Sequence, residues 1–488
     1  MVRKSLWVLL LLSMLILNAC AAPAGEEGDQ ARIEELEAAL AEAEASGEAS
    51  EEELADLQAQ LEEAQAAGVE EVTVVTVWQH EFPPLQEAFT EKWIPEFEAE
   101  HPGVKVELTA LPYAGVVAYD AKLLAALSGG EGPDLWDMGD WHYKEFYEAD
   151  FLAPLDPEIF GYADSQEMID AYAPGTMSIF IHDGQVYGLF SEYNTLALFY
   201  NLDMFEAAGI EPLPADKPVS WDEIAEISKK LYAEDPDTGA ITSMGYQFGF
   251  FANYRSPQWY AQGFYALMRQ FGQDDLYVDD VPAANTEAAV DAFQVIYDYT
   301  WTDKAYDPTF INNWFADLPT GRIGMVLAGT WYVPAAEPNN PDWRFGVAPH
   351  PVVDPDDPET YHNIQWSWGW SVNGNASPEK QQLAQEFLAF MLGKKGEVEQ
   401  AAWWFDNLGY TQPSIAFLES DVYAETLEAD PWLKVWVDAF DTYEIEYLQH
   451  MYDEPGMALM RAMDRVIYDQ MSPQDTADLL QAELERLE

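Results

Sequence analysis

Four side chains stand directly after strand-like runs of the sequence, where they could contact a ligand. Gln79 and Glu81 follow one such run, and Asp140 and Trp141 follow another. Carboxylate and amide groups form paired hydrogen bonds, and an indole ring offers a flat apolar face. This combination suits a ligand that has both hydrogen-bonding groups and apolar faces. For the two carboxylates, a solvated surface position is an equally good interpretation.

The segments around these side chains predict a βαβ unit. The apolar, β-branched run 72–78 is typical of a strand buried on both faces. Pro102-Gly103 turns the chain into a second strand at 104–108, and a third strand is expected at 134–138. The helix between the first two strands is indicated by apolar residues at four-residue steps: Leu85, Phe89, Trp93 and Phe97. Because ligands of such folds bind at the carboxyl ends of the strands, we expect both pairs at one cleft.

Eighteen tryptophans are many for this length, and most tryptophans in any protein are structural. Trp141 and Trp331 follow strand-like runs, so each is a candidate to stack on a ligand, with a core position as the alternative. The members that lie within periodic or strand-like runs are expected in the core: Trp93, Trp136, Trp301, Trp314, Trp432 and Trp436.

Length and charge narrow the class of protein. The 488 residues are too many for one hydrophobic core, which predicts two lobes or more. Hydrophobic residues at 49% exclude disorder for most of the chain. A net charge of −66 excludes nucleic acid as a partner, because no basic stripe can displace phosphate counterions, and it disfavours adhesion to anionic lipid.

The N-terminus has the pattern of a secretory signal. Arg3 and Lys4 precede an apolar run of about a dozen residues, which is shorter than the roughly 20 that a membrane-spanning helix needs. Residues 17–20 resemble the bacterial lipobox, although Asn18 departs from its usual residue choice. We therefore expect a signal peptide at 1–19 and lipidation of Cys20, which is the only cysteine and rules out an internal disulfide. The alternative is an ordinary signal peptide followed by a chance cysteine.

Residues 20–71 read as an acidic, helical, coiled-coil-like spacer. Two blocks of apolar residues follow the 3-4-3 spacing of a helix, and Gly47 and Ser50 interrupt the pattern between them. The charge is nearly all of one sign, so self-association is possible but not compelling.

From residue 72 onward, the order of segments resembles the extracellular solute-binding proteins of sugar importers, the family that includes the maltodextrin-binding protein. No single segment is diagnostic, but their joint order over some four hundred residues is. The segments that carry the resemblance are Phe97–Val106, Gly132–Leu135, Leu152–Asp156, Tyr187–Leu189, Leu198–Phe205, Ala208–Ile210, Ser220–Glu223, Gly321–Met325, Gly329–Trp331, Phe345–Pro349 and Ala384–Leu388.

The resemblance implies an α/β, periplasmic-binding-protein-like fold, with two α/β lobes, crossing hinge strands and a ligand cleft between the lobes. The first lobe would comprise 72–192 with 371–430, and the second 193–370. C-terminal helices in 431–488 would border both. The implied function is capture of a mono- or oligosaccharide by lobe closure and delivery to the permease of an ABC importer, whose separate ATPase supplies the energy.

The resemblance also implies further ligand-binding residues. Trp331 matches the family segment that supplies a stacking tryptophan, and Trp368 lies at the return crossing. Tyr254 and Trp259 occupy a region where the maltodextrin receptor offers a ring. Asn194 stands where that receptor has an acidic sugar contact, which puts the same sugar in doubt. Arg461 belongs to the helical region that borders the cleft, with an ion pair to Asp464 or Asp469 as the alternative.

No cofactor or metal is expected, since the seven histidines lack paired ligand spacing and no phosphate-binding glycine loop is present. A secreted glycoside hydrolase is the main rival, because it too combines carboxylates with aromatic rings. A receptor for another polar solute and a scaffold acting through the acidic helices are further alternatives. The expected state is a monomer, lipid-anchored outside the cytoplasmic membrane.

Overall fold

The computed structural model describes single helical positions between 36 and 61, and then residues 72–112, 116–248, 257–310, 313–446, 448, 450 and 453–487. In the spacer, the described positions at 36–43 and 54–61 are helical, as expected. The predicted signal peptide, Cys20 and Tyr254 lie outside the described residues. Among the described helices, none has both the length and the apolar character that a bilayer crossing requires.

The first sheet is mixed and has the strand order β15-β14-β3-β1-β2. The strand β6 also pairs with β14, on the edge opposite to β3 and along part of the length of β14. β1 and β3 run parallel, whereas β14 runs antiparallel to both β3 and β6. The strands are β1 (Thr73–His80), β2 (Val104–Leu111), β3 (Leu135–Gly139), β6 (Leu189–Thr195), β14 (His362–Val372) and β15 (Glu444–Glu446). The predicted βαβ unit is therefore present.

The first strand differs in one respect from its expected burial on both faces. Val75 and Val77 are fully buried, but Thr76 and Trp78 are partly exposed. The ammonium group of Lys122, on a neighbouring helix, lies 5.6 Å from the centre of the Trp78 ring. A long side chain thus covers this face in place of a closed apolar layer.

Helices pack around the first sheet, and the predicted helix 85–97 spans three consecutive segments. Its four apolar residues are all buried, and Trp93 contacts Trp403 and Trp404 of a later helix. The elements are α4 (Pro83–Ala88), η1 (Phe89–Trp93), α5 (Ile94–Glu100), α6 (Val116–Gly129), η2 (Asp140–His142), α7 (Tyr143–Glu148), α8 (Ser165–Asp170), η3 (Thr176–Phe180), the hairpin β4 (Ile181–His182) and β5 (Gln185–Val186), α16 (Pro378–Leu392) and α17 (Glu399–Leu408).

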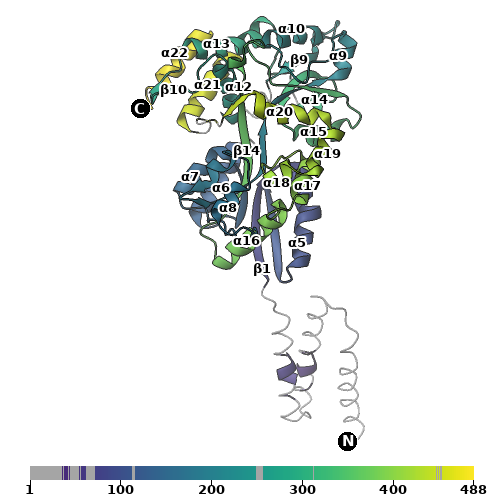
Figure 1. The fold of residues 1–488 in the computed structure, drawn as a ribbon, viewed down its shortest axis with the longest axis vertical. Helices are drawn as coiled ribbons and strands as arrows, with labels where there is room; N and C mark the ends of the chain where they lie inside the picture. The colour runs from purple at the N-terminus through teal and green to yellow at the C-terminus, as the bar shows by residue number, and fades with distance from the viewer. Residues whose placement is uncertain are drawn as a thin grey trace. The chain divides into compact units, whose positions relative to one another are not determined.

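The second sheet has the order β13-β7-β12-β9-β8 and lies beyond the first along β6 and β14 (Figure 1). β12 is parallel to β9 and antiparallel to β7. Its strands are β7 (Ala197–Asn201), β8 (Ala233–Glu234), β9 (Ile241–Gln247), β12 (Ile323–Ala328) and β13 (Phe345–Ala348). All six residues of β12 are buried, as its central place requires.

The helices of the second lobe include α9 and α10, which contact the sheet, and α12, which contacts β14. Ser220 caps α10 by accepting a hydrogen bond from the Glu223 amide, at the Ser-Trp-Asp-Glu segment. The elements are α9 (Leu202–Ala208), α10 (Trp221–Leu231), α12 (Pro257–Gln270), the hairpin β10 (Tyr277–Val278) and β11 (Val281–Pro282), α13 (Glu287–Tyr297), η4 (Asp298–Thr302), α14 (Trp314–Asp317), α15 (Tyr332–Ala336), η5 (Glu337–Asn339) and η6 (Pro358–Thr360).

Two antiparallel strand connections join the sheets. The chain leaves the first sheet at the end of β6 and enters the second with β7, so that only Leu196 separates the two strands. It returns through β14, which pairs with β6 from Gln365 to Trp370. The predicted residue limits of the two lobes remain predictions, because the strands at the boundary continue from one sheet into the other.

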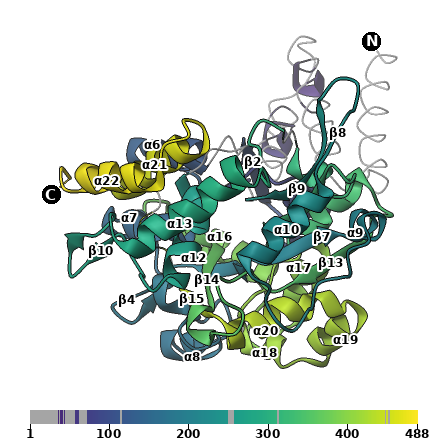
Figure 2. The same cartoon turned by 90° about the horizontal axis from the view of Figure 1, so that it is seen from above.

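The C-terminal helices contact elements of both sheets. On α20 (Lys434–Thr442), the Trp436 indole donates a hydrogen bond to the Thr195 carbonyl at the end of β6. α21 (Glu454–Ile467) and α22 (Pro473–Leu484) pack against α13, beside which Figure 2 shows them. The remaining short helices are α18 (Ile415–Leu418), α19 (Asp421–Ala429) and η7 (Pro431–Leu433).

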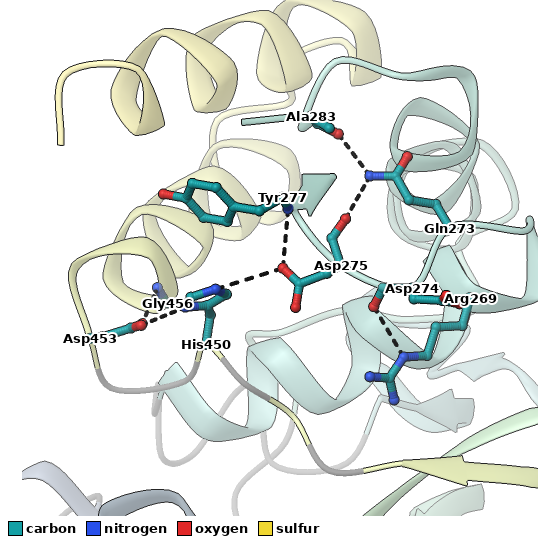
Figure 3. A network of polar contacts seen from close by, with 9 residues as sticks. All are labelled: Arg269, Gln273, Asp274, Asp275, Tyr277, Ala283, His450, Asp453 and Gly456. Atoms are coloured by element: carbon teal, nitrogen blue, oxygen red, sulfur yellow. Dashed lines mark hydrogen bonds and ion pairs between the residues drawn. The ribbon is translucent and has the colours of Figure 1, made fainter. Parts of the chain in front are cut away.

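A polar network ties the start of α21 to the segment after α12 (Figure 3). His450 Nδ1 lies 2.5 Å from Asp453 Oδ2, and its Nε2 lies 3.7 Å from Asp275 Oδ1. Asp453 also caps α21 by accepting a hydrogen bond from the Gly456 amide. Burial lowers the pKa of His450, but the hydrogen bond to Asp453 and the charges of both carboxylates outweigh burial and raise it overall.

His450→Gln should lower the free energy of unfolding mainly at acidic pH. A raised histidine pKa gives stability that is complete below the unfolded value of about 6.5 and is lost as pH rises through the folded value. We expect a larger loss at pH 5.5 than at pH 8.5. Urea denaturation at both pH values measures it, and an equal loss at the two would show that the charge of His450 has no role.

Candidate ligand-binding site

The site is organised on one face of the paired strands β6 and β14. Asn194 lies opposite Trp366, and Glu192 lies opposite Trp368. Because side chains alternate along a strand, these four residues project to the same side of the pair. They are all buried.

A Gly-Asp-Trp segment of the first lobe reaches this face at the end of β3. A Cβ atom on Gly139 would lie 2.1 Å from the ring of Trp141, so only glycine leaves room for that ring. The Trp141 ring meets Trp368 edge to face, with ring centres 5.2 Å apart. Asp140 lies between Gly139 and Trp141 in the sequence, and its Oδ2 accepts a 3.0 Å hydrogen bond from the Ser367 hydroxyl, which alternates to the opposite face of β14 from Trp366 and Trp368.

A Gly-Thr-Trp segment of the second lobe repeats this arrangement after β12. A Cβ atom on Gly329 would lie 2.4 Å from Trp331 Nε1 and 2.8 Å from the ring of Trp366. Thr330 Oγ1 accepts a 2.8 Å hydrogen bond from the Asn194 amide and donates one to the Gly409 carbonyl. The two lobes therefore present the same kind of segment, Gly-polar-Trp, to the two strands that join them.

Two carboxyl groups of the site are buried, and neither pairs with a basic side chain among the described residues. Glu192 accepts a 2.9 Å hydrogen bond from the Asn194 amide and another from the Trp366 side chain. Asp140 as a residue is partly exposed, but its Oδ1 is fully covered and has no hydrogen-bond partner among the described residues. Burial is the main cause that raises the pKa of each group to about 8. Without a ligand, both are largely protonated at neutral pH.

Gln79 and His80 are the last two residues of β1, and His80 contacts Trp368 of the site. Gln79 is fully buried, and neither side-chain polar atom has a hydrogen-bond partner among the described residues. Amides of this kind are normally satisfied by a water or a ligand atom. The His80 ring stacks on Trp368 at 4.0 Å, and its Nδ1 lies 2.6 Å from Asp137 Oδ2. Tyr119 donates a hydrogen bond to the same carboxylate. The Asp137 carboxylate is thus held in place, and it orients the His80 ring on which Trp368 stacks.

Three of the tryptophans proposed to stack on a ligand are covered in this form of the protein. Trp368, Trp331 and Trp259 are 6%, 7% and 8% exposed. The centre of the Trp331 ring lies 6.5 Å from that of Trp259 and 6.4 Å from that of Trp366. Trp331, Trp259 and Trp366 form one aromatic cluster, whereas Trp368 packs against His80 and Trp141. A ligand reaches the faces of these rings only if they rearrange.

The other predicted residues lie elsewhere. The side chain of Glu81 is exposed, while its backbone amide bonds to the Leu111 carbonyl. The exposed Arg461 pairs with Glu483 of α22 at 3.0 Å and is not brought to the cluster. Arg461 therefore forms an ion pair, as in the alternative interpretation, but with Glu483 of α22 instead of Asp464 or Asp469.

Sequence reasoning missed Glu192, Trp366, Thr330 and Ser367 as members of the site. One signal for the first two was available. Glu192 precedes Asn194 by two residues, and Trp366 precedes Trp368 by two, so each lies on the same face of its strand as a residue already chosen. Ser367 and Thr330 gave no such signal, because their partners come from distant segments.

Two hollows adjoin this junction. Asn194 and Thr330 help to line one of about 570 Å³, together with aromatic residues of α19 and α20. Another, of about 960 Å³, runs between α4 with α17 and the segment around α15, and Phe82, Phe315 and Trp403 line it. Both are of the size that ligand pockets have, roughly 300–1,000 Å³.

Asp140→Asn should stabilise the protein at alkaline pH. The folded pKa of about 8 lies above the unfolded value of 3.8, so the native state loses stability as pH rises between them, and asparagine removes this loss. We expect a gain in unfolding free energy of roughly 2–5 kcal/mol at pH 8.5 and little change at pH 4. The exposed Glu428→Gln is the control, and matching pH profiles for the two variants would contradict the burial of Asp140.

Gly329→Ala should destabilise the aromatic cluster, since its methyl group would overlap the Trp331 and Trp366 rings. We expect a cost of about 1–3 kcal/mol in thermal unfolding, with altered tryptophan fluorescence. Gly129→Ala, at the end of α6, has no atom within 4 Å of the added Cβ and is the matched control. An equal melting temperature for the two variants would mean that the cluster is loosely packed.

Comparisons with known proteins agree with this architecture. A binding protein of Brucella abortus (strain 2308) is 25% identical over 260 residues, which cover 52% of this chain and 58% of that protein. The arabinooligosaccharide-binding protein of Bacillus subtilis (strain 168) is 22% identical over 432 residues, 85% of this chain and 92% of the relative. MalE3 of T. maritima with maltose bound has a TM-score of 0.69 at 19% identity, covering 85% of this chain and 100% of that structure.

The chain thus spans 58% of the length of the Brucella protein. The T. maritima structure, at 19% identity, shows a similar fold. The family profile of bacterial extracellular solute-binding proteins matches residues 82–398, more than half of the sequence. That family comprises binding proteins rather than enzymes. With two sheets joined by crossing strands and a profile match of this extent, the chain belongs to the bacterial extracellular solute-binding protein family.

Proposed function

We propose that this protein captures a mono- or oligosaccharide outside the cytoplasm and delivers it to the permease of an ABC importer. The observation that carries the proposal is the convergence of the two Gly-polar-Trp segments, one from each lobe, on β6 and β14. It places indole rings beside carboxyl, amide and hydroxyl groups. Sugars need this mixture, because they present hydroxyl groups at their edges and apolar C–H groups on their faces.

The relatives support the same class of ligand. The Bacillus subtilis relative is named for binding arabinooligosaccharides, and the T. maritima structure holds maltose. Asn194, Asp140 and Gln79 supply the hydrogen-bonding groups that such ligands require. Which sugar binds is a question for measurement.

Capture proceeds by separation and closure of the lobes about the β6–β14 connections. In the open form, Trp331 parts from Trp366 and both rings gain a free face. A sugar then binds the first-lobe groups, and the second lobe closes so that Trp331 covers it. The permease recognises the closed form, since only in that form do the two lobes have a fixed position relative to each other.

The proposal also covers where the protein is located, which is the cell envelope. Cys20 carries the lipid anchor, the acidic helices of 20–71 hold the receptor away from the bilayer, and the protein acts as a monomer. The permease and its ATPase are separate chains.

The site favours binding over hydrolysis. A glycoside hydrolase needs two carboxyl groups in different states, one protonated and one ionised. Here burial raises the pKa of both Asp140 and Glu192, and their hydrogen-bond partners are neutral. No basic side chain among the described residues holds either carboxyl ionised, as the nucleophile of a hydrolase would be.

Trp331→Phe should weaken sugar binding by about 0.5–1.5 kcal/mol, because the smaller ring stacks less well. Calorimetry with the best ligand of a mono- and oligosaccharide panel, found by thermal shift, measures it. Trp343→Phe is the control, since Trp343 is equally buried at 7% but stacks on Phe345 of the second sheet.

Unchanged affinity in Trp331→Phe would remove that ring from the site. Chromatography of recovered ligand tests the rival function: intact oligosaccharide supports the receptor, and shortened products would replace it with a hydrolase. A panel without any saccharide ligand would overturn carbohydrate capture.

A further inference from the structure

A small cavity lies inside the second lobe, next to the aromatic cluster. It measures about 20 Å³, which is room for one water-sized group. Leu327 of β12 and Phe248, which directly follows β9, form part of its wall. β9 and β12 run parallel, and ligands of α/β folds bind at the carboxyl ends of such strands. The cavity is therefore at the edge of the second sheet where a ligand is expected.

The side chain of Gln262, on α12, lines this cavity with unused polar atoms. Gln262 is 1% exposed, and neither its Oε1 nor its Nε2 has a hydrogen-bond partner among the described residues. A side-chain amide has two donor hydrogens and an acceptor oxygen with two lone pairs. Burying these groups without partners destabilises the fold, so a buried amide of this kind normally binds a polar group. The cavity is the space in which such a group can reach Gln262.

A second glutamine of the same helix shows the contrast. Gln270 is buried too, but its Oε1 accepts a 2.9 Å hydrogen bond from the Trp221 indole. Its Nε2 donates to the carbonyl groups of Pro351 at 2.9 Å and His362 at 3.1 Å. Gln270 thus connects elements of the folded lobe, whereas the amide of Gln262 has no such structural role.

The surroundings of the cavity select a neutral hydrogen-bonding group. His350 also lines it, and burial lowers the pKa of this ring to about 4, so the ring is neutral at pH 7. Its Nδ1 lies 2.8 Å from the Pro351 carbonyl and donates to it, which leaves Nε2 as an acceptor. The other described residues that line the cavity have no titratable side chain. A hydroxyl group, which both donates and accepts, fits an amide and a neutral imidazole, whereas an ion would be buried without a counter-charge.

We propose that Gln262 determines which saccharide binds, because one hydroxyl or hydroxymethyl group of the sugar enters this cavity and forms hydrogen bonds with the Gln262 amide. The inference rests on the proposed function and adds a specificity-determining residue to it. A site that binds a hydroxyl group by hydrogen bonds rejects the analogue that lacks it, since the buried amide is then left without a partner.

Trp259 controls the way in. It lies three residues before Gln262, on the same face of α12, and its ring lines the cavity on one side and contacts Trp331 and Trp366 of the cluster on the other. When the lobes open and Trp331 parts from Trp366, the Trp259 ring loses these neighbours and can turn aside. A sugar that stacks on the cluster then has a hydroxyl group within reach of Gln262.

Calorimetry on the full chain tests the proposal with the tightest-binding saccharide of a panel that includes maltose, cellobiose, mannobiose and arabinobiose. Each monodeoxy form of that saccharide is measured beside it. The wild type should bind one monodeoxy form about tenfold or more weakly than the parent sugar. Gln262→Leu should bind the parent about tenfold or more weakly than the wild type does, and should no longer distinguish it from that monodeoxy form.

The melting temperature of the ligand-free protein separates a binding role from a structural one. Leucine has a similar volume and no polar atom, so Gln262→Leu should keep or raise the melting temperature. Gln270→Leu is the matched control on the same helix and should lower it, because the hydrogen bonds to Trp221, Pro351 and His362 are lost. A loss in Gln262→Leu as large as in Gln270→Leu, with unchanged saccharide affinity, would mean that Gln262 holds a structural water only and would overturn the inference.

The binding outcomes separate this inference from the proposed function. Discrimination against the monodeoxy form that survives in Gln262→Leu would overturn the role of Gln262 and leave carbohydrate capture standing. A wild type that binds every monodeoxy form as tightly as the parent would do the same. If no saccharide of the panel binds to the wild type, the proposed function itself is overturned, and this inference with it.

Discussion

The antiparallel pairing of β6 with β14 is the constraint on which the rest of the structure depends. These strands are the only covalent path that the described residues show between the two sheets, so their register fixes which residues of the lobes can meet. Trp366 and Trp368 of one strand face Asn194 and Glu192 of the other. A shift by one residue would turn all four side chains to the opposite face and remove the site.

The two Gly-polar-Trp segments show how each lobe is fastened to that pair. In each, the glycine leaves space for an indole ring two residues later, and the polar residue between them bonds to a crossing strand. The first lobe is also held by the pairing of β3 with β14, whereas the Gly-Thr-Trp segment of the second lobe meets the strand pair through one hydrogen bond, at about 1 kcal/mol, and one ring contact. The weaker contact is the one that would part in the lobe opening we propose.

Buried acids give this junction its chemical character. Burial raises the pKa of Asp140 and Glu192, and the hydrogen bonds from Ser367 and Asn194 satisfy one oxygen of each. In the function proposed above, carboxyl groups of this kind accept hydrogen bonds from the ligand. Perturbed carboxyl groups are common at ligand sites.

The sequence alone determined the βαβ start of the body, the helix at 85–97, the strand ends that carry Asp140 and Trp331, and the family. These features follow from local apolar spacing, turn residues and segment order, which every stretch of chain carries in itself. Only the tertiary structure decided that Ser367 binds Asp140, that Trp366 completes the cluster, and that Arg461 pairs with Glu483 instead of reaching it. Those contacts join residues tens to hundreds of positions apart, and strand register and helix packing, which no local pattern encodes, bring them together.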